Sequence, residues 1–253
     1  EKNPDRVIEE RKIGFPVDII ESRYPLQFNF YPFYDPPERA RFYNPLQGGI
    51  SISNEKFDGF GTLGGIVRDR ETGALMVLSN WHVLAGFDDF HPGLKILQPG
   101  YGDGGRLRDT IAYLKRHAME QGIDAAVAEL TDTRSISNDQ YEIGPVGGVA
   151  EPELDMDVLK SGRTSGITYG KITGIAGTTK INYGGFPRVI NHVVHIAQNR
   201  REQVSSAGDS GSWWLEERTK KVVSLHFAGS NLPEYGIGIA MPDVLDALNV
   251  DII

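Results

Sequence analysis

Short apolar runs separated by glycine-rich turns recur through most of the chain, and this pattern limits the fold more than any other feature. Residues 61–68 and 74–79 flank a polar turn at 70–73, which predicts a β-hairpin. Residues 241–248 form the one convincing helix pattern, with Pro242 near its start. Many short strands and one late helix predict an all-β barrel or sandwich. Further strands are expected at 95–97, 110–115, 125–130, 158–160, 170–176, 178–183, 192–197, 212–215, 222–227 and 236–240.

The composition excludes several classes of function. The net charge of −8 argues against a nucleic-acid partner or an anionic membrane surface, because both attract clusters of Lys and Arg. The chain has no apolar run of about 18 residues, so we expect no membrane span. Cysteine is absent, which excludes disulfides, a cysteine nucleophile and cysteine-ligated metals. The length of 253 residues allows one large β domain or two small ones.

The first 45 residues differ in character from the rest. No signal peptide is visible, so a cytoplasmic location is favoured over secretion. Residues 24–45 hold eight Phe or Tyr and five Pro, which is incompatible with a helix. We expect an extended strap that packs on the main domain, with a pro-segment lying over the active site as the alternative.

The segment 205–212 carries the strongest chemical signal. A serine hydroxyl such as that of Ser210 is a poor nucleophile until a base takes its proton. A glycine two positions earlier, Gly208, lets the backbone turn so that its own N–H and that of Ser210 point at one developing oxyanion. The GxSxG pattern of α/β-hydrolases is not met, because position 212 is Ser. The GxGxxG match at 59–64 precedes a strand and no helix, which excludes a dinucleotide fingerprint.

A base and its orienting carboxylate can also be chosen from the sequence. His82 follows the predicted hairpin within Ser-Asn-Trp-His-Val, and it is one of only six histidines. Asp124 stands at the start of the largely apolar strand expected at 125–130, where a carboxylate is costly to bury unless it is paired. We therefore expect Asp124 to hold the His82 imidazole as the third member of a triad.

The order His82, Asp124, Ser210, with SNxHV, DAAVA and GDSGS around them, resembles the chymotrypsin-fold (trypsin-like) serine peptidases. More narrowly, the chain is similar to cysteine-free bacterial members and to plant relatives of the NARROW LEAF type. The resemblance covers about residues 46–253 and implies two six-stranded antiparallel β-barrels, at about 46–145 and 146–253, with the active site between them. It also implies a C-terminal helix, a protein or peptide substrate, an acyl-enzyme on Ser210, and no metal or cofactor.

Three positions depart from relatives of this kind. No Ile-Val-Gly-Gly start is present, so Asp209 is expected to find another partner or a backbone amide. Val204 stands where the trypsin subgroup has Asp, which argues against cleavage after Arg or Lys. His226 and Ser205 match the carboxylate-binding positions of bacterial glutamyl endopeptidases, and an imidazolium with a hydroxyl suits a carboxylate or an amide. The alternative is an uncharged pocket for small or apolar residues.

Two other functions stay open at this point. One is a peptide-binding or scaffold domain of the same fold with little turnover, and the other is a non-peptidase acyl hydrolase. The intact set of three residues argues against the scaffold. A homo-oligomer is neither predicted nor excluded.

Overall fold

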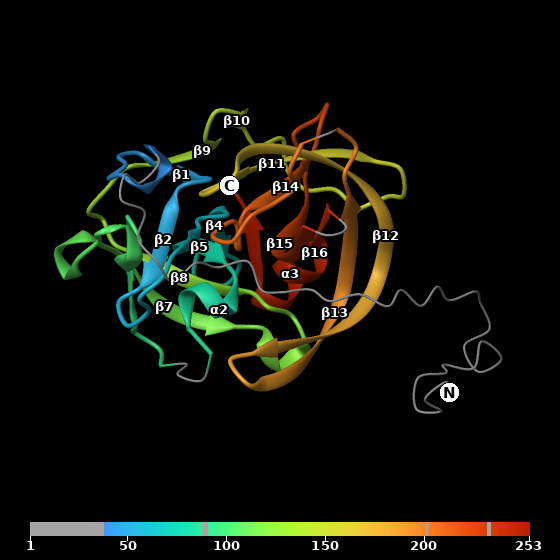
Figure 1. Cartoon of the computed structure of the whole chain (residues 1–253). Coiled ribbons are helices and arrows are strands. Elements are labelled where there is room, and N and C mark those ends of the chain that lie inside the picture. The colour runs from blue at the N-terminus through green and yellow to red at the C-terminus, as the bar shows by residue number, and fades with distance from the viewer. Residues whose placement is uncertain (1–37, 88–90, 201, 232–233) are drawn as a thin grey trace.

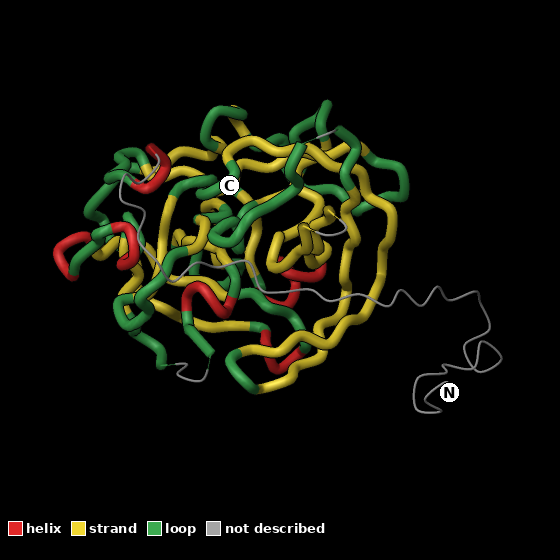
Figure 2. Tube along the Cα trace, viewed as in Figure 1, coloured by secondary structure: helices red, strands yellow, loops and turns green. Residues whose placement is uncertain are grey.

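The structure is a computed structural model that describes residues 38–87, 91–200, 202–231 and 234–253. It consists mostly of β-strands with few helices (Figure 1 and Figure 2). Residues 1–37, which make up most of the strap predicted at 1–45, lie outside the described residues. The strands are β1 (Leu46–Gly48), β2 (Ser51–Asn54), β3 (Gly61–Thr62), β4 (Gly65–Asp69), β5 (Leu75–Ser79), β6 (Lys95–Leu97), β7 (Thr110–His117), β8 (Ala126–Leu130), β9 (Ile136–Gln140), β10 (Gly144–Pro145), β11 (Asp157–Gly162), β12 (Gly166–Tyr183), β13 (Phe186–Ala197), β14 (Trp213–Glu216), β15 (Val222–Asn231), β16 (Glu234–Ala240) and β17 (Val250–Ile252). The helices are α2 (Trp81–Leu84) and α3 (Met241–Leu248), with short 3₁₀ turns at Glu38–Ala40, Tyr101–Asp103, Leu107–Asp109 and Met119–Gln121.

The C-terminal half closes into a six-stranded antiparallel barrel in the order β11-β12-β13-β16-β15-β14. Its interior is filled by fully buried apolar side chains from facing strands, such as Val158, Ile172, Ile196 and Trp214. Apolar residues at alternate positions of these strands point to one side, which is why a short alternating pattern produces a filled barrel.

The N-terminal half is an eight-stranded sheet in the order β17-β4-β5-β8-β7-β6-β2-β3, curved into a barrel-like arrangement. A small sheet, β1-β9-β10, lies beside it. β17 follows α3 at the end of the C-terminal half and pairs antiparallel with β4, with Val250 opposite Asp69. Two barrel-like sheets and one C-terminal helix confirm the predicted fold class.

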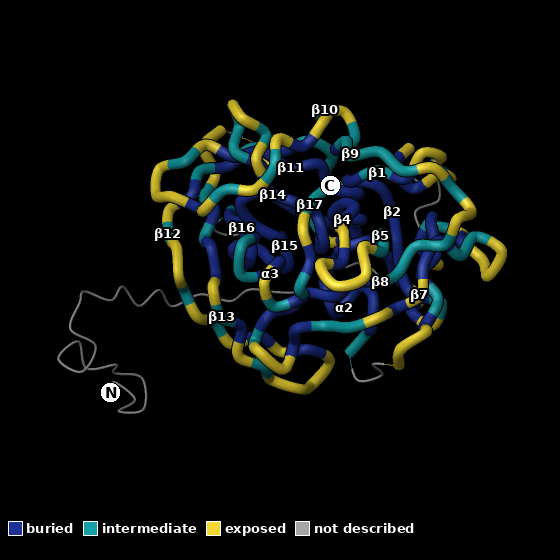
Figure 3. Tube along the Cα trace, turned by 180° about the vertical axis from the view of Figure 1, so that it is seen from behind, coloured by how far each residue is buried: buried dark blue, intermediate teal, exposed yellow. Residues whose placement is uncertain are grey.

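Trp213 lies where the two halves meet. It is fully buried, and a Cβ on Gly65 would stand 2.4 Å from its ring. A Cβ on Gly64 would likewise stand 2.2 Å from the indole nitrogen of Trp213. The chain that enters β4 can therefore approach the indole only because Gly64 and Gly65 carry no side chains. Seen from behind, the buried positions concentrate in the middle of the molecule, whereas exposed positions follow the outer sides of β12 and β13 (Figure 3).

The longest hairpin differs from the sequence prediction. Strands were expected at 170–176 and 178–183, but β12 runs without interruption from Gly166 to Tyr183. Shifts of register between Ile172 and Thr179 bend the strand instead of ending it, and Ala176 has a φ of 53° there. Conversely, the strand predicted at 61–68 is divided into β3 and β4.

In the parts of the chain that the structure describes, no helix is long and apolar enough to cross a membrane.

Candidate active site

His82 lies in α2, a single helical turn that directly follows β5. Its backbone N–H donates to Asp124 Oδ1 at 3.1 Å, and its ring Nδ1 lies 2.6 Å from Asp124 Oδ2. Both side chains are fully buried. Because a carboxylate accepts at Nδ1, the neutral imidazole carries its proton there and has its lone pair on Nε2. That tautomer is the one that can take a proton from a hydroxyl.

Asp124 lies in the turn just before β8, as predicted. Asn80 Nδ2 donates to its backbone carbonyl at 2.8 Å, which fixes the turn beside α2. A third donor reaches the carboxylate, because the hydroxyl of Tyr183 donates to Oδ2 at 2.8 Å. The expectation that this buried carboxylate must be paired is confirmed. The sequence analysis did not identify Tyr183 as a partner of Asp124. Its position directly before Gly184-Gly185, a pair typical of a hairpin turn, is the sequence signal for it.

Ser210 lies in the loop between β13 and β14. Its carbonyl accepts the N–H of Thr62 at 2.7 Å, and its hydroxyl donates to the carbonyl of Phe227 at 3.1 Å. A Cβ on Gly61 would meet Val83 at 2.5 Å and the Ser210 carbonyl at 3.0 Å. The Ser210 loop is thus packed, through Gly61, against the helix that carries His82. The structure therefore pairs His82 with Asp124 and places the Ser210 loop beside the helix of that histidine.

Gly208 has a backbone conformation that favours glycine. Its φ is 103°, and a Cβ there would stand 2.3 Å from Thr164 Oγ1 and 2.7 Å from the Phe60 ring. Thr62 Oγ1 donates to its carbonyl at 2.8 Å, which holds the peptide in one orientation. Within the described residues, neither the N–H of Gly208 nor that of Ser210 donates to a protein acceptor.

Asp209 is the most heavily hydrogen-bonded carboxylate of the loop. Lys160 Nζ donates to it at 2.7 Å, and both side chains are fully buried. Burial alone would raise the pKa of Asp209, but the Lys160 charge and the donors around it outweigh burial and lower the pKa to about 2. The expectation that Asp209 finds another partner is confirmed. The sequence analysis did not identify Lys160 as this partner, although a lysine directly after Val158 and Leu159 in a predicted strand is a signal for a buried ion pair. The backbone donors are the N–H groups of Thr164, Ser165 and Ser206.

The residues predicted to line the specificity pocket are adjacent. A Cβ on Gly236 would stand 3.1 Å from the ring of His226 and 3.4 Å from the Val204 side chain. Trp214 Nε1 donates to His226 Nδ1 at 3.2 Å. Burial lowers the pKa of His226 to about 3, with the Lys160 charge acting in the same direction. Full burial therefore favours the neutral ring, in contrast to the imidazolium that the sequence analysis considered. The Ser205 hydroxyl is buried and has no hydrogen-bond partner among the described residues.

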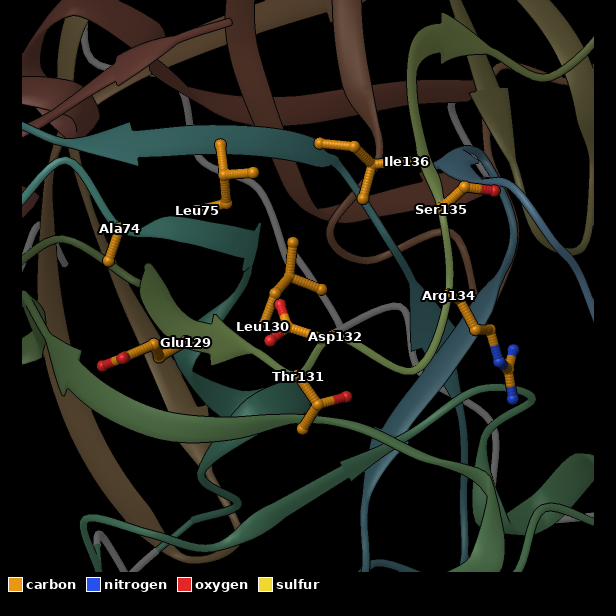
Figure 4. Close-up of a pocket in the computed structure, with 9 residues that line it drawn as sticks. All are labelled: Ala74, Leu75, Glu129, Leu130, Thr131, Asp132, Arg134, Ser135 and Ile136. Atoms are coloured by element: carbon orange, nitrogen blue, oxygen red, sulfur yellow. The ribbon is translucent and has the colours of Figure 1, made fainter.

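Two pockets on the described surface lie away from this site. One of about 390 Å³ opens where β5 begins and β8 leads into β9, and its lining residues are shown in Figure 4. The other, of about 780 Å³, is lined mainly by acidic residues between Glu153 and Asp157 and at Glu216 and Glu217. Neither contains His82 or Ser210. No group of three His, Asp or Glu side chains suited to a metal ion occurs in the described part of the chain.

No protein-family model and no curated protein sequence matches this chain. Solved structures do match in shape. A glutamic acid-specific serine protease is 18% identical with a TM-score of 0.62, covering 82% of this chain and 100% of its own. A Nocardiopsis protease is 17% identical, with a TM-score of 0.60 and 81% and 97% coverage, and a Cellulomonas bogoriensis chymotrypsin is 16% identical, with 0.58 and 82% and 97%. The chain therefore has the chymotrypsin-type fold of these serine proteases.

Proposed function

We propose that this protein is a serine endopeptidase that acts on protein or peptide substrates, with His82, Asp124 and Ser210 as its catalytic residues. The observation that carries the proposal is the pair of contacts from His82 to the buried Asp124 carboxylate, beside the loop that holds Ser210. Buried pairing of this kind sets the imidazole tautomer that a serine nucleophile requires.

The reaction follows from this arrangement. The Ser210 hydroxyl turns from the Phe227 carbonyl toward His82, which takes its proton as Oγ bonds to the substrate carbonyl carbon. The amides of Gly208 and Ser210 donate to the resulting oxyanion. The carbon–nitrogen bond then breaks, and His82 returns the proton to the leaving amine. Water, deprotonated by His82, hydrolyses the acyl-enzyme and restores Ser210.

The proposal places the chain with the cysteine-free bacterial type of this fold, in which no new N-terminus is needed beside Asp209. The buried Lys160 ammonium supports this, because it neutralises Asp209 from within β11. The division into a strap at 1–45 and a peptidase domain at 46–253, and the relation to the plant NARROW LEAF type, stay predictions.

Substrate preference is assigned to Val204, Ser205 and His226. A neutral imidazole beside a buried, unpartnered hydroxyl offers hydrogen bonds without a full positive charge. Such a pocket suits a carboxylate or amide side chain, and the neighbouring glutamic acid-specific protease uses a histidine triad in substrate binding. Small or apolar residues are the alternative occupants. Arg and Lys are disfavoured, since Val204 supplies no carboxylate.

The test combines labelling with turnover. A fluorophosphonate should label Ser210 in the wild type, and Ser210→Ala should lose the label together with about 10⁶-fold in turnover. His82→Ala should lose a similar factor, and Asp124→Asn about 10⁴-fold. A digest of a peptide library, read by mass spectrometry, then identifies the cleaved bonds. Full peptidase activity in Ser210→Ala would contradict the mechanism.

Two outcomes separate the alternatives. No labelling of the folded wild type would favour the scaffold function. Labelling with hydrolysis of esters but not of peptides would favour an acyl hydrolase.

A further inference from the structure

Tyr183 joins the C-terminal half of the molecule to the carboxylate beside His82. It is the last residue of β12, and its hydroxyl donates to Asp124 Oδ2 at 2.8 Å. The same oxygen contacts His82 Nδ1 at 2.6 Å. All three side chains are fully buried. One carboxylate oxygen is therefore shared between the imidazole and a phenol from the other half.

The hairpin turn explains how this phenol arrives there. Tyr183 pairs with Phe186 across a two-residue loop, in which Gly184 and Gly185 have φ values of 60° and 102°. Two successive residues with positive φ make the tight turn that suits a twisted hairpin. Asn182 Oδ1 accepts the N–H of Gly185 at 2.7 Å and closes the turn. The end of the β12–β13 hairpin is thus a defined structure that fixes the position of Tyr183.

The end of the β12–β13 hairpin lies beside the N-terminal half (Figure 1), and residues of both strands contact that half. The Tyr183 ring packs edge-on against Trp81 at 5.8 Å and lies 6.0 Å from the His82 ring. On β13, the N–H of Asn191 donates to the carbonyl of Gly122 at 2.8 Å, two residues before Asp124. The hairpin therefore holds the Asp124 turn through its backbone and through its carboxylate.

We propose that Tyr183 is a positioning residue of the proposed peptidase, which holds Asp124 in the orientation that reaches His82 and makes this orientation depend on the seated β12–β13 hairpin. The inference rests on the proposed function. A carboxylate in a buried site needs donors for its remaining lone pairs, and without them it gains freedom to turn away. The phenol is suited to this role because burial, followed by the nearby Asp124 charge, raises its pKa well above 10, so it stays a donor.

Other titratable groups near this cluster come from three strands. Arg188 of β13 lies over the Trp81 ring at 5.2 Å, and the His117 ring of β7 is 6.3 Å from it. His226 of β15 also interacts electrostatically with His82. These groups are unchanged when the Tyr183 hydroxyl is removed, so a shift in the pH profile reports on the shared carboxylate.

The experiment uses Tyr183→Phe in the full chain, since this variant retains the ring that packs on Trp81. Tyr169→Phe is the matched control, because it removes a hydroxyl from the same strand at a ring stacked under Arg200, 3.5 Å from its centroid. We expect Tyr183→Phe to lower kcat by roughly tenfold to a hundredfold with little change in KM. The pH profile should also change, because the carboxylate that faces His82 has lost one of its donors. The control should change neither.

A proton NMR signal of His82 Nδ1–H separates this inference from the proposed function. If the wild type turns over peptides and Tyr183→Phe matches it in kcat and pH profile, the positioning role is wrong and the proposed function stands. If the wild type has no turnover, the proposed function fails. The positioning of Asp124 is then judged by the signal alone: a displaced or broadened signal in Tyr183→Phe supports it, and an unchanged signal overturns it.

Discussion

Lys160 and Asp209 form an ion pair of 2.7 Å in which neither side chain has any exposed surface. The carboxylate next to Ser210 is thereby neutralised by a residue of β11, in the wall of the C-terminal barrel. Because Asp209 also accepts three backbone N–H groups, the pair fixes the loop that presents the amides of Gly208 and Ser210.

Lys160→Met should destabilise the protein by about 3–5 kcal/mol, because it leaves the Asp209 carboxylate buried without its cation. Urea denaturation of the purified variant measures this free energy of unfolding. The control is Lys171→Met, which breaks the half-exposed pair with Asp157 at 3.0 Å and should cost at most about 1 kcal/mol. Equal losses in the two variants would show that burial of the first pair has no special consequence.

Gly208→Ala should reduce kcat by about 10²–10³-fold, the range seen when one oxyanion donor is lost. The added Cβ meets Thr164 and Phe60, so the peptide has to move away from the orientation that offers its N–H. Gly104→Ala is the control, since Gly104 has a φ of 88° and open space around its Cα. Steady-state kinetics with one peptide substrate compares the two. A full-rate Gly208→Ala enzyme would contradict the assigned oxyanion donors.

His226 should leave substrate preference unchanged between pH 5 and pH 8. Its pKa of about 3 lies below the ordinary value near 6.5, so the folded protein keeps the ring neutral throughout this range. The unfolded chain takes up a proton below about pH 6.5 while the folded one does not, so this residue lowers stability as pH falls through that value. Library digests at pH 5, 6.5 and 8 give the preference directly, with His226→Ala as the comparison. A preference for acidic residues that grows on acidification would indicate a charged imidazole.

Deleting residues 1–45 should lower the melting temperature or cause aggregation. Within this segment, Arg39 is buried and donates to Ser161 Oγ at 2.8 Å, and the N–H of Tyr43 donates to Gln98 Oε1 at 2.9 Å. Their loss exposes polar groups that are now satisfied. Thermal unfolding and turnover are measured together on the truncated chain. If the truncated chain were more active and equally stable, residues 1–45 would be an inhibitory pro-segment and not a structural strap.

The sequence was sufficient for those parts of the site whose chemistry is local. Gly208 and Gly211 must be glycines because neighbouring atoms already fill the space that a Cβ would need. A short sequence motif can reveal a local requirement of this kind. Asp124 could be chosen because a carboxylate at the start of an apolar strand needs a partner. The short strands and α3 followed from periodicity and from Pro242.

Contacts between distant segments could not be predicted in this way. The length and bend of β12 bring Tyr183 and Asp124 together. Both depend on shifts of register that no pattern in the sequence predicts. The protonation of His226 could not be derived from the sequence for a related reason. Its pKa depends on how completely the barrel excludes water around it, and burial is a property of the whole fold.

The pairing of β17 with β4 also has a consequence for the stage of synthesis at which the N-terminal sheet can be completed. A ribosome that has made only the N-terminal half has synthesised a sheet without its edge strand, and the Arg116 guanidinium still lacks the Leu248 carbonyl to which its Nε donates at 2.8 Å. Ser210 and the Tyr183 hairpin also emerge later than His82. The proposed active site should therefore be complete only after both halves have been translated.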